Sequence, residues 1–146
     1  MITQAATYLF GAPEEINGAR RCPTYLYRWI ILATQWFKVY LHHFVGDDWS
    51  LDVHDHPKRF ITIGLWGSYL ETTPSGQRWY HAPWIRSFPA THRHRLETPL
   101  GDCWTLCIVL KGEREWGFWN NGRWIRWDEY TTGSASGVAD GRKSCV

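Results

Sequence analysis

Histidines in two distant segments of the sequence could bind one metal ion. His54 and His56 are separated by one residue, and a second cluster downstream holds His92 and His94. In a β-strand alternate side chains face the same way, so His54 and His56 would share one face while Asp55 turns to the other. A third imidazole from another strand would complete a facial set and leave coordination positions open for water, dioxygen or substrate. The spacing by itself leaves both His92 and His94 available as the third ligand.

The two segments resemble the two motifs of the cupin superfamily. The first cupin motif runs roughly HxH, then E, then G, and the second runs roughly PxGxxHxxxN. His54 and His56 match the paired histidines, residues 65–67 match the turn that ends in glycine, and residues 89–97 match the second motif. The resemblance therefore implies that His94 is the third ligand.

The sequence departs from the cupin pattern at three positions, and these departures bear on the ligand set. Phe60 lies near the position where many cupins carry a carboxylate ligand, Thr91 replaces the glycine of the second motif, and Thr98 replaces its asparagine. The resemblance thus implies a site with three histidines, similar to that of thiol dioxygenases such as cysteine dioxygenase. Across residues 25–130 the pattern is also similar to short single-domain cupins of bacteria and their phages.

Three neutral imidazoles would leave the charge of a divalent cation uncancelled, which makes the metal a strong Lewis acid. We favour iron(II), because open facial positions can bind substrate and dioxygen together and the resemblance implies the same, although zinc, manganese or nickel would accept these ligands. The expected function is an iron(II) oxygenase or dioxygenase acting on a small molecule. The alternatives are a metal-assisted isomerase, epimerase or hydrolase, and a noncatalytic cupin that binds a ligand or a partner protein.

Three residues are candidates for substrate binding. Arg28, with Tyr27 beside it on a predicted strand, could bind a carboxylate or phosphate through its bidentate guanidinium, and Arg59 offers a second such group. The ordinary alternative for each arginine is a surface position or an ion pair with a carboxylate.

Two further residues are candidates for proton transfer. His42 lies on the same strand face as Phe44, and His43 lies on the opposite face, so only one of these histidines should point inward; we favour His42. A solvated or core position is the ordinary alternative. Asp52 precedes His54 by two residues, which places it on the metal face if the strand begins early enough, and a carboxylate there could act as a base.

The composition indicates strands as the elements that position these residues. The chain has 146 residues, 44% of them hydrophobic, with 11 Trp, 7 Tyr and 6 Phe. Aromatic side chains favour strands, and sustained helical periodicity is lacking between residues 24 and 130. We therefore expect an all-β fold, a small antiparallel jelly-roll barrel of the cupin type, over residues 24–130. Residues 1–23 are expected to form an N-terminal arm, and residues 131–146 a flexible C-terminal tail.

Three turns organise the predicted barrel. Residues 24–32 and 37–45 are aromatic and aliphatic runs that could form a hairpin, and Asn120-Asn121-Gly122 is a strong hairpin signal between residues 115–119 and 123–127. Residues 99–102 are a third plausible hairpin loop.

Charge, hydropathy and cysteine content limit the possible partners and location. The net charge of +2 is spread along the chain, so we expect a small-molecule partner and no clear nucleic-acid site. A secretory signal and an apolar run of roughly 20 residues are not evident, which favours a cytoplasmic protein. The four cysteines are too irregularly spaced for a disulfide framework. Exposed strand edges make a homodimer possible.

Overall fold

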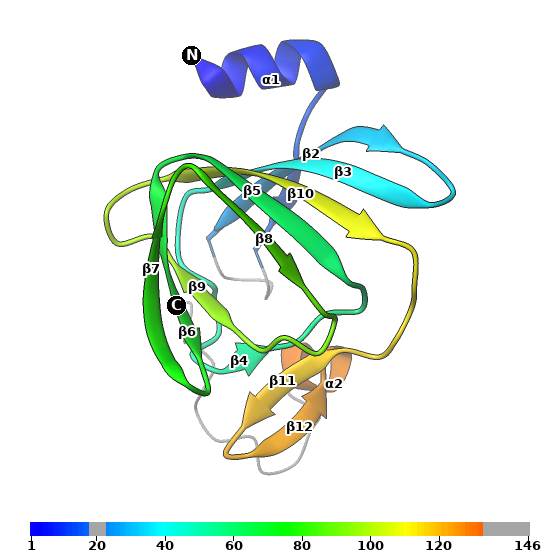
Figure 1. Cartoon of the computed structure of the whole chain (residues 1–146), viewed down its shortest axis with the longest axis vertical. Coiled ribbons are helices and arrows are strands. Elements are labelled where there is room, and N and C mark those ends of the chain that lie inside the picture. The colour runs from blue at the N-terminus through cyan, green and yellow to red at the C-terminus, as the bar shows by residue number, and fades with distance from the viewer. Residues whose placement is uncertain (18–22, 133–146) are drawn as a thin grey trace.

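A computed structural model describes residues 1–17 and 23–132 of the protein (Figure 1). Within these residues two helices and twelve strands are formed. Their bounds are α1 (Ile2–Phe10), β1 (Glu14–Ile16), β2 (Leu26–Ala33), β3 (Phe37–Phe44), β4 (Val53–His54), β5 (Phe60–Trp66), β6 (Ser68–Thr73), β7 (Gly76–His81), β8 (Trp84–Phe88), β9 (Arg95–Glu97), β10 (Cys103–Leu110), β11 (Gly117–Asn120), β12 (Arg123–Arg126) and α2 (Trp127–Thr132).

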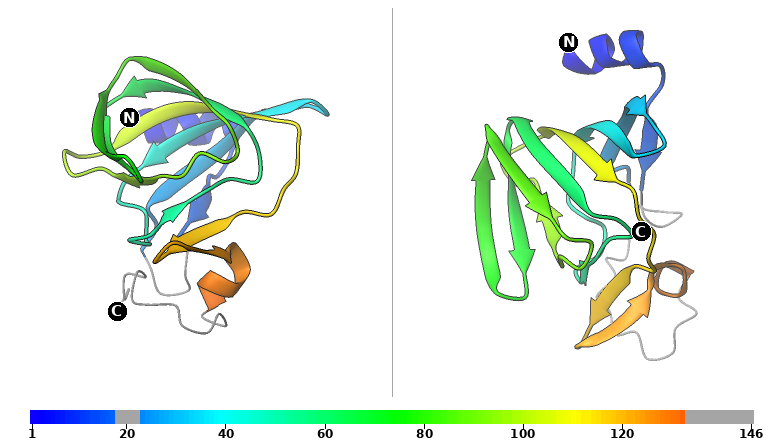
Figure 2. Two further views of the ribbon diagram at one scale, coloured as in Figure 1. Left: turned by 60° about the horizontal axis from the view of Figure 1, so that its bottom comes forward. Right: turned by 45° about the vertical axis from the view of Figure 1, so that its right-hand side comes forward.

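The strands pair antiparallel and divide among three sheets. The largest has the order β1-β2-β3-β10-β5-β8, and the two small sheets have the orders β7-β6-β9 and β12-β11-β4. The small sheets lie on one side of the large sheet and α1 on the other (Figures 1 and 2). The predicted antiparallel all-β fold is therefore confirmed. Hydrogen bonding among the described residues joins the strands into three separate sheets and does not close them into one continuous barrel.

The two faces of the large sheet have different partners because side chains alternate along each strand. On the outer face, Trp29, Leu41 and Trp104 pack with Ala6 of α1, and the Trp29 and Trp104 rings stack with centroids 5.8 Å apart. On the inner face, Phe60 and Phe88 form a second apolar cluster with Cys107. The inner face is the one that turns toward β4 and β9, and it therefore faces the predicted metal ligands.

Two of the three predicted hairpins are present. β2 pairs with β3, and β11 pairs with β12 across a turn in which Asn121 and Gly122 have φ values of 49° and 76°. Asparagine and glycine tolerate this left-handed conformation better than other residues, which explains the turn. The third prediction was wrong: residues 99–102 connect β9, which pairs with β6, to β10, which pairs with β3 and β5. A polar turn sequence cannot tell a hairpin from a crossing between sheets.

The N-terminal segment contains regular structure that the sequence did not predict. α1 covers the outer face of the large sheet, and β1 adds an edge strand beside β2. At the other end, α2 extends to Thr132, and the remainder of the predicted tail, 133–146, lies outside the described residues. Cys22 and Cys145 also lie outside them, whereas Cys103 and Cys107 are buried free thiols. No helix in the described part of the chain is long and apolar enough to span a membrane.

Candidate metal centre

Backbone pairing brings together His54 and His94, which are distant in sequence. His54 at the end of β4 and His94 just before β9 exchange both backbone hydrogen bonds, at 2.9 and 3.0 Å. Residues paired in this way on antiparallel strands stand directly opposite each other with their side chains on the same face. The imidazole ring centroids of the two residues are 5.1 Å apart. The fold therefore supplies the second segment that the sequence prediction required.

His56 completes the cluster although β4 ends at His54. The backbone N–H of His56 donates to the carbonyl of Ala90, and the side chain of Asp55 turns the opposite way. Asp55 accepts hydrogen bonds from the backbone N–H of Gly117 at 2.8 Å and from Nε1 of Trp124 at 3.2 Å. These contacts hold the chain extended, so His54 and His56 share a face as the strand period predicts.

The distances within the cluster fit ligation of one metal ion. One ligand atom from each of His54, His56 and His94 lies within 4.8 Å of the others. The Nε2 atoms of His56 and His94 are 3.0 Å apart. Two imidazole nitrogens that bind one metal at about 2.1 Å and at a right angle would be separated by about 3.0 Å. The donor set therefore suits a mononuclear metal.

The environment keeps the three imidazoles neutral, which leaves a lone pair on each for a metal. Burial lowers the pKa of His54 and His56 well below the ordinary value, and the neighbouring imidazole of His94 lowers each pKa further. Burial also lowers the pKa of His94, although its hydrogen bond to Glu71 opposes this effect. A metal ligand must be deprotonated, so these residues are in the required state at neutral pH.

Glu71 of β6 orients His94 and was missed by sequence reasoning. Its Oε1 atom accepts hydrogen bonds from Nδ1 of His94 at 2.8 Å and from Nε2 of His92 at 2.9 Å, and its Oε2 atom accepts one from Arg86 at 2.7 Å. A proton on Nδ1 leaves the lone pair of His94 on Nε2, the atom that faces His56. The one available signal in the sequence was an isolated carboxylate within the apolar run 60–72.

A second group of possible ligands consists of Glu71, His92 and His94. It suits a cation less well than the three-histidine group, because Arg86 already neutralises the Glu71 carboxylate and both imidazoles donate to it. Burial raises the pKa of Glu71, but the hydrogen bonds from His92, His94 and Arg86 lower it more, so the carboxylate stays ionised. We assign this group to the support of His94.

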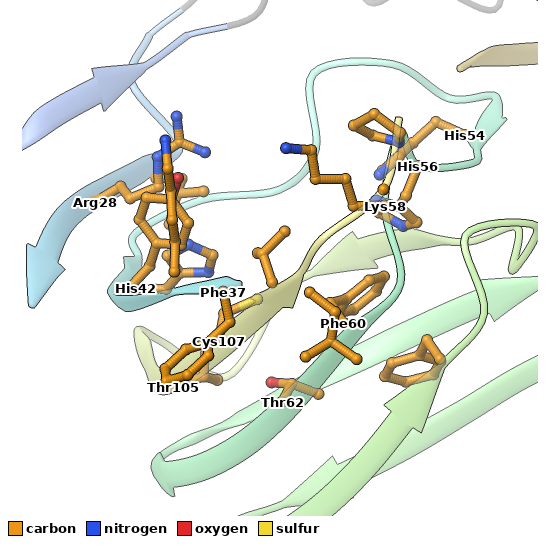
Figure 3. Close-up of a pocket in the computed structure, with 18 of the residues that line it drawn as sticks. Arg28, Phe37, His42, His54, His56, Lys58, Phe60, Thr62, Thr105 and Cys107 are labelled. Carbon is orange, nitrogen blue, oxygen red and sulfur yellow. The ribbon is translucent and has the colours of Figure 1, made fainter. Parts of the chain in front are cut away.

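The three-histidine cluster opens onto a cavity of about 710 Å³ between the large sheet and the loops beneath it. Arg28 and His42 lie at one end of this cavity and His54 and His56 at the other, with Phe60 and Cys107 between them (Figure 3). Burial raises the pKa of Cys107 to about 12, so its thiol is protonated at neutral pH.

The structure brings two of the five other predicted site residues to the cavity. Arg28 and His42 line it, on strands β2 and β3, where they stand opposite each other. Nε2 of His42 is buried and has no hydrogen-bond partner among the described residues. Arg28 also pairs with Glu14 at 2.7 Å, so it forms the ion pair with a carboxylate that was the alternative to substrate binding.

The other three predicted residues lie away from the cavity. Tyr27 follows the strand alternation to the outer face, where its ring lies 6.2 Å from that of His43. Arg59 is exposed and does not line the cavity. Asp52 lies just before β4 begins, and its carboxylate accepts hydrogen bonds from Tyr130 at 2.7 Å and Asn120 at 2.8 Å.

Asp48 is a second carboxylate near the histidines that sequence reasoning passed over. Its Oδ2 atom lies 3.7 Å from Nδ1 of His54 and accepts a hydrogen bond from the backbone N–H of Leu96 at 2.8 Å. Asp48 lines the cavity, but at 3.7 Å its carboxylate is too far from Nδ1 of His54 for a hydrogen bond and acts on that imidazole through its charge.

The buried His42 predicts that the metal-free protein loses stability in acid. Burial, and secondarily Arg28, lowers the pKa of His42 from 6.5 to about 3. Below pH 6.5 the unfolded chain binds a proton that the folded chain does not, so stability falls as pH falls. From pH 7 to pH 5 this one group should cost about 2 kcal/mol. Urea unfolding of the His42→Gln variant should show a correspondingly smaller loss than the unsubstituted protein.

A matched control is His81→Gln, since His81 is exposed. This variant should lose as much stability between pH 7 and pH 5 as the unsubstituted protein. Equal losses in all three proteins would contradict the buried, neutral state of His42.

Comparisons with known proteins identify the fold. No protein-family model and no curated protein matches the sequence. A sugar phosphate isomerase from a cupin superfamily, from Silicibacter pomeroyi, shares 13% identity over 60% of this chain and 60% of its own, with a TM-score of 0.51. A structure of DMSP lyases shares 15% identity over 59% of this chain and 47% of its own, with a TM-score of 0.50.

A cupin domain from Bordetella pertussis shares 18% identity over 58% of this chain and 92% of its own, with a TM-score of 0.48. At such identities structural similarity shows the fold alone. The similarity to the Silicibacter pomeroyi structure shows that the chain has the cupin fold, as its resemblance to the cupin motifs implied.

Proposed function

We propose that this cupin-fold protein binds one divalent cation, iron(II) in its active form, through His54, His56 and His94 and oxidises a small molecule with dioxygen. The observation that carries the proposal is the convergence of three neutral imidazoles at the wall of a large cavity. Two carboxylates lie beside them: Glu71 accepts a hydrogen bond from Nδ1 of His94, and Asp48 lies 3.7 Å from Nδ1 of His54. Such a ligand set would leave positions open toward the cavity.

The residues around the cluster have distinct roles in this proposal. Iron(II), when bound, would supply dioxygen activation, which the side chains of the protein cannot provide. Glu71 fixes the orientation of His94, and Asp55 fixes the backbone between the two other ligands. The ring of Phe60, whose centroid lies 4.5 Å from that of His56, excludes water from one side of the cluster.

Nitric oxide binding tests the open positions without a known substrate. The protein is purified anaerobically, loaded with iron(II) and exposed to nitric oxide, which stands in for dioxygen. We expect about one iron per chain and an EPR signal of an iron-nitrosyl complex. The His94→Asn variant should show neither. Iron that is retained but does not bind nitric oxide would contradict the oxygenase proposal.

A second candidate is a metal-assisted isomerase or lyase in which His42 moves a proton. It is favoured by the buried Nε2 of His42, which has no hydrogen-bond partner within residues 1–17 and 23–132, and by the position of His42 in the same cavity as the metal cluster. The sugar phosphate isomerase and the DMSP lyases of similar fold add to this candidate. Turnover of a sugar phosphate under argon, lost in His42→Gln, would favour it over the oxygenase, whose turnover requires dioxygen.

A third candidate is a noncatalytic cupin that binds a ligand. Tight binding of a small molecule by protein that retains no metal would favour it.

A further inference from the structure

The cavity is much larger than a metal and its water ligands require. Its volume of about 710 Å³ lies within the range of roughly 300–1,000 Å³ that is typical of sites for drug-sized molecules. Its central wall is apolar and includes Phe37, Phe44, Phe60, Phe88 and Val109. Phe60 and Phe88 stack with ring centroids 4.9 Å apart and planes inclined at 29°, so together they form an aromatic part of this wall. The body of a ligand that fills this space is therefore apolar or aromatic.

The charged side chains that line the cavity give it a positive potential. Four cations, Arg28, Lys38, Lys58 and Lys111, face two carboxylates, Asp48 and Glu113, and Arg28 also pairs with Glu14, which leaves the lysines as the main source of positive charge. Within residues 1–17 and 23–132, Lys38 and Lys58 form no ion pair. Concave apolar walls strengthen such a field, and it attracts an anion.

The arrangement of the polar groups indicates where an anionic group would lie. Lys58 is half-buried and reaches along the cavity from the histidine cluster toward Arg28 and His42 (Figure 3). Nε2 of His42 is buried at that end without a hydrogen-bond partner in the described residues. Buried polar atoms are rarely left unpaired, so this atom is suited to bind a polar group of a ligand.

We propose that the cavity binds an amphipathic anion, an aromatic or aliphatic molecule with one carboxylate, sulfonate or phosphate group. The anionic group lies between Lys58 and Arg28, within reach of His42, and the apolar body lies over Phe60 and Phe88 toward the three histidines. The identity of this molecule as a substrate rests on the proposed function. Its binding does not, because the groups that hold it belong to the protein and not to a metal.

Two related fluorescent dyes test the proposal in metal-free protein. 8-Anilinonaphthalene-1-sulfonate carries an aromatic body and a sulfonate, and N-phenyl-1-naphthylamine is the same body without the sulfonate. We expect the sulfonate dye to bind one site per chain and to bind about tenfold tighter than the neutral dye, since a charged hydrogen bond contributes about that much. The Lys58→Gln variant should abolish the difference between the two dyes.

The matched control is Arg59→Gln, which removes one positive charge from the adjacent residue, outside the cavity. It should leave the difference between the dyes intact. Val109→Trp, which fills the cavity, should prevent binding of both dyes, and displacement by 2-naphthoate gives a second measure of the same site. Equal affinity of the two dyes, or equal effects of Lys58→Gln and Arg59→Gln, would overturn the proposal.

The outcome is separable from that of the metal experiments. Selective binding of the sulfonate dye by a protein that fails to bind iron would support the ligand and contradict the oxygenase. Iron binding without dye selectivity would contradict the proposed ligand and leave the oxygenase proposal supported.

Discussion

Replacing His94 with asparagine is expected to weaken divalent metal binding by at least about 100-fold, because even residues that only orient a metal ligand change affinity by about 10- to 100-fold. Asparagine places an amide nitrogen near the position of Nδ1, so it can still donate to Glu71. It lacks a group at Nε2, the atom that lies 3.0 Å from Nε2 of His56. The variant therefore removes the ligand while keeping the buried hydrogen bond. Calorimetric titration with Zn²⁺ and visible spectra with Co²⁺ measure the loss.

His92→Gln is the matched control and separates the two possible metal groups. Glutamine places its amide nitrogen near the position of Nε2, the atom of His92 that donates to Glu71. Because His92 is not part of the three-histidine cluster, this variant should lose less than about tenfold in metal affinity. If His92→Gln loses as much affinity as His94→Asn while His54→Asn retains metal, the metal lies in the group of Glu71, His92 and His94.

The three-histidine cluster could be predicted because it depends on strand geometry and on a local motif. Because side chains alternate along a strand, His54 and His56 were expected on one face and Asp55 on the other. The resemblance to the second cupin motif selected His94. The same period placed His42 inside and His43 outside, as the structure has them. The same alternation placed Tyr27 and Arg28 on opposite faces of the strand. The sequence therefore already argued against the prediction that both residues bind the substrate.

The supporting carboxylates could not be predicted, because they depend on which strands pair. Glu71 reaches His94 only because β6 pairs with β9, with Glu71 opposite Leu96. Asp48 approaches His54 because its carboxylate binds the backbone of the same β9 residue, Leu96. Asp52 turned away for a similar reason, since it binds Tyr130 of a helix, α2, that the sequence did not indicate. The pattern of a single sequence shows which residues share one face of a strand, but it does not show which strands lie next to each other.

Glu71→Gln is expected to reduce both the stability of the protein and its affinity for metal. Glu71 is only 2% exposed and is held by Arg86, His92 and His94. Glutamine keeps the shape of the side chain. Its amide N–H₂ group, however, would replace a carboxylate oxygen that now accepts hydrogen bonds, and Arg86 would lose its counter-charge. Breaking a buried ion pair costs about 3–5 kcal/mol, and loss of a group that orients a ligand costs about 10- to 100-fold in affinity.

The double variant Glu71→Met with Arg86→Met separates these two effects. Replacing both members of a buried ion pair with apolar side chains of similar volume is often neutral for stability, so urea unfolding should show recovery of the part of the loss that comes from the unpaired Arg86 charge, while His92 and His94 still lack their acceptor. Metal affinity should stay low, because Nδ1 of His94 still lacks its acceptor and the lone pair is no longer held on Nε2. Glu97→Gln, which removes a carboxylate paired with Arg95 outside the cluster, should change metal affinity little. If the double variant recovers metal affinity along with stability, Glu71 serves the fold alone and does not position the ligand.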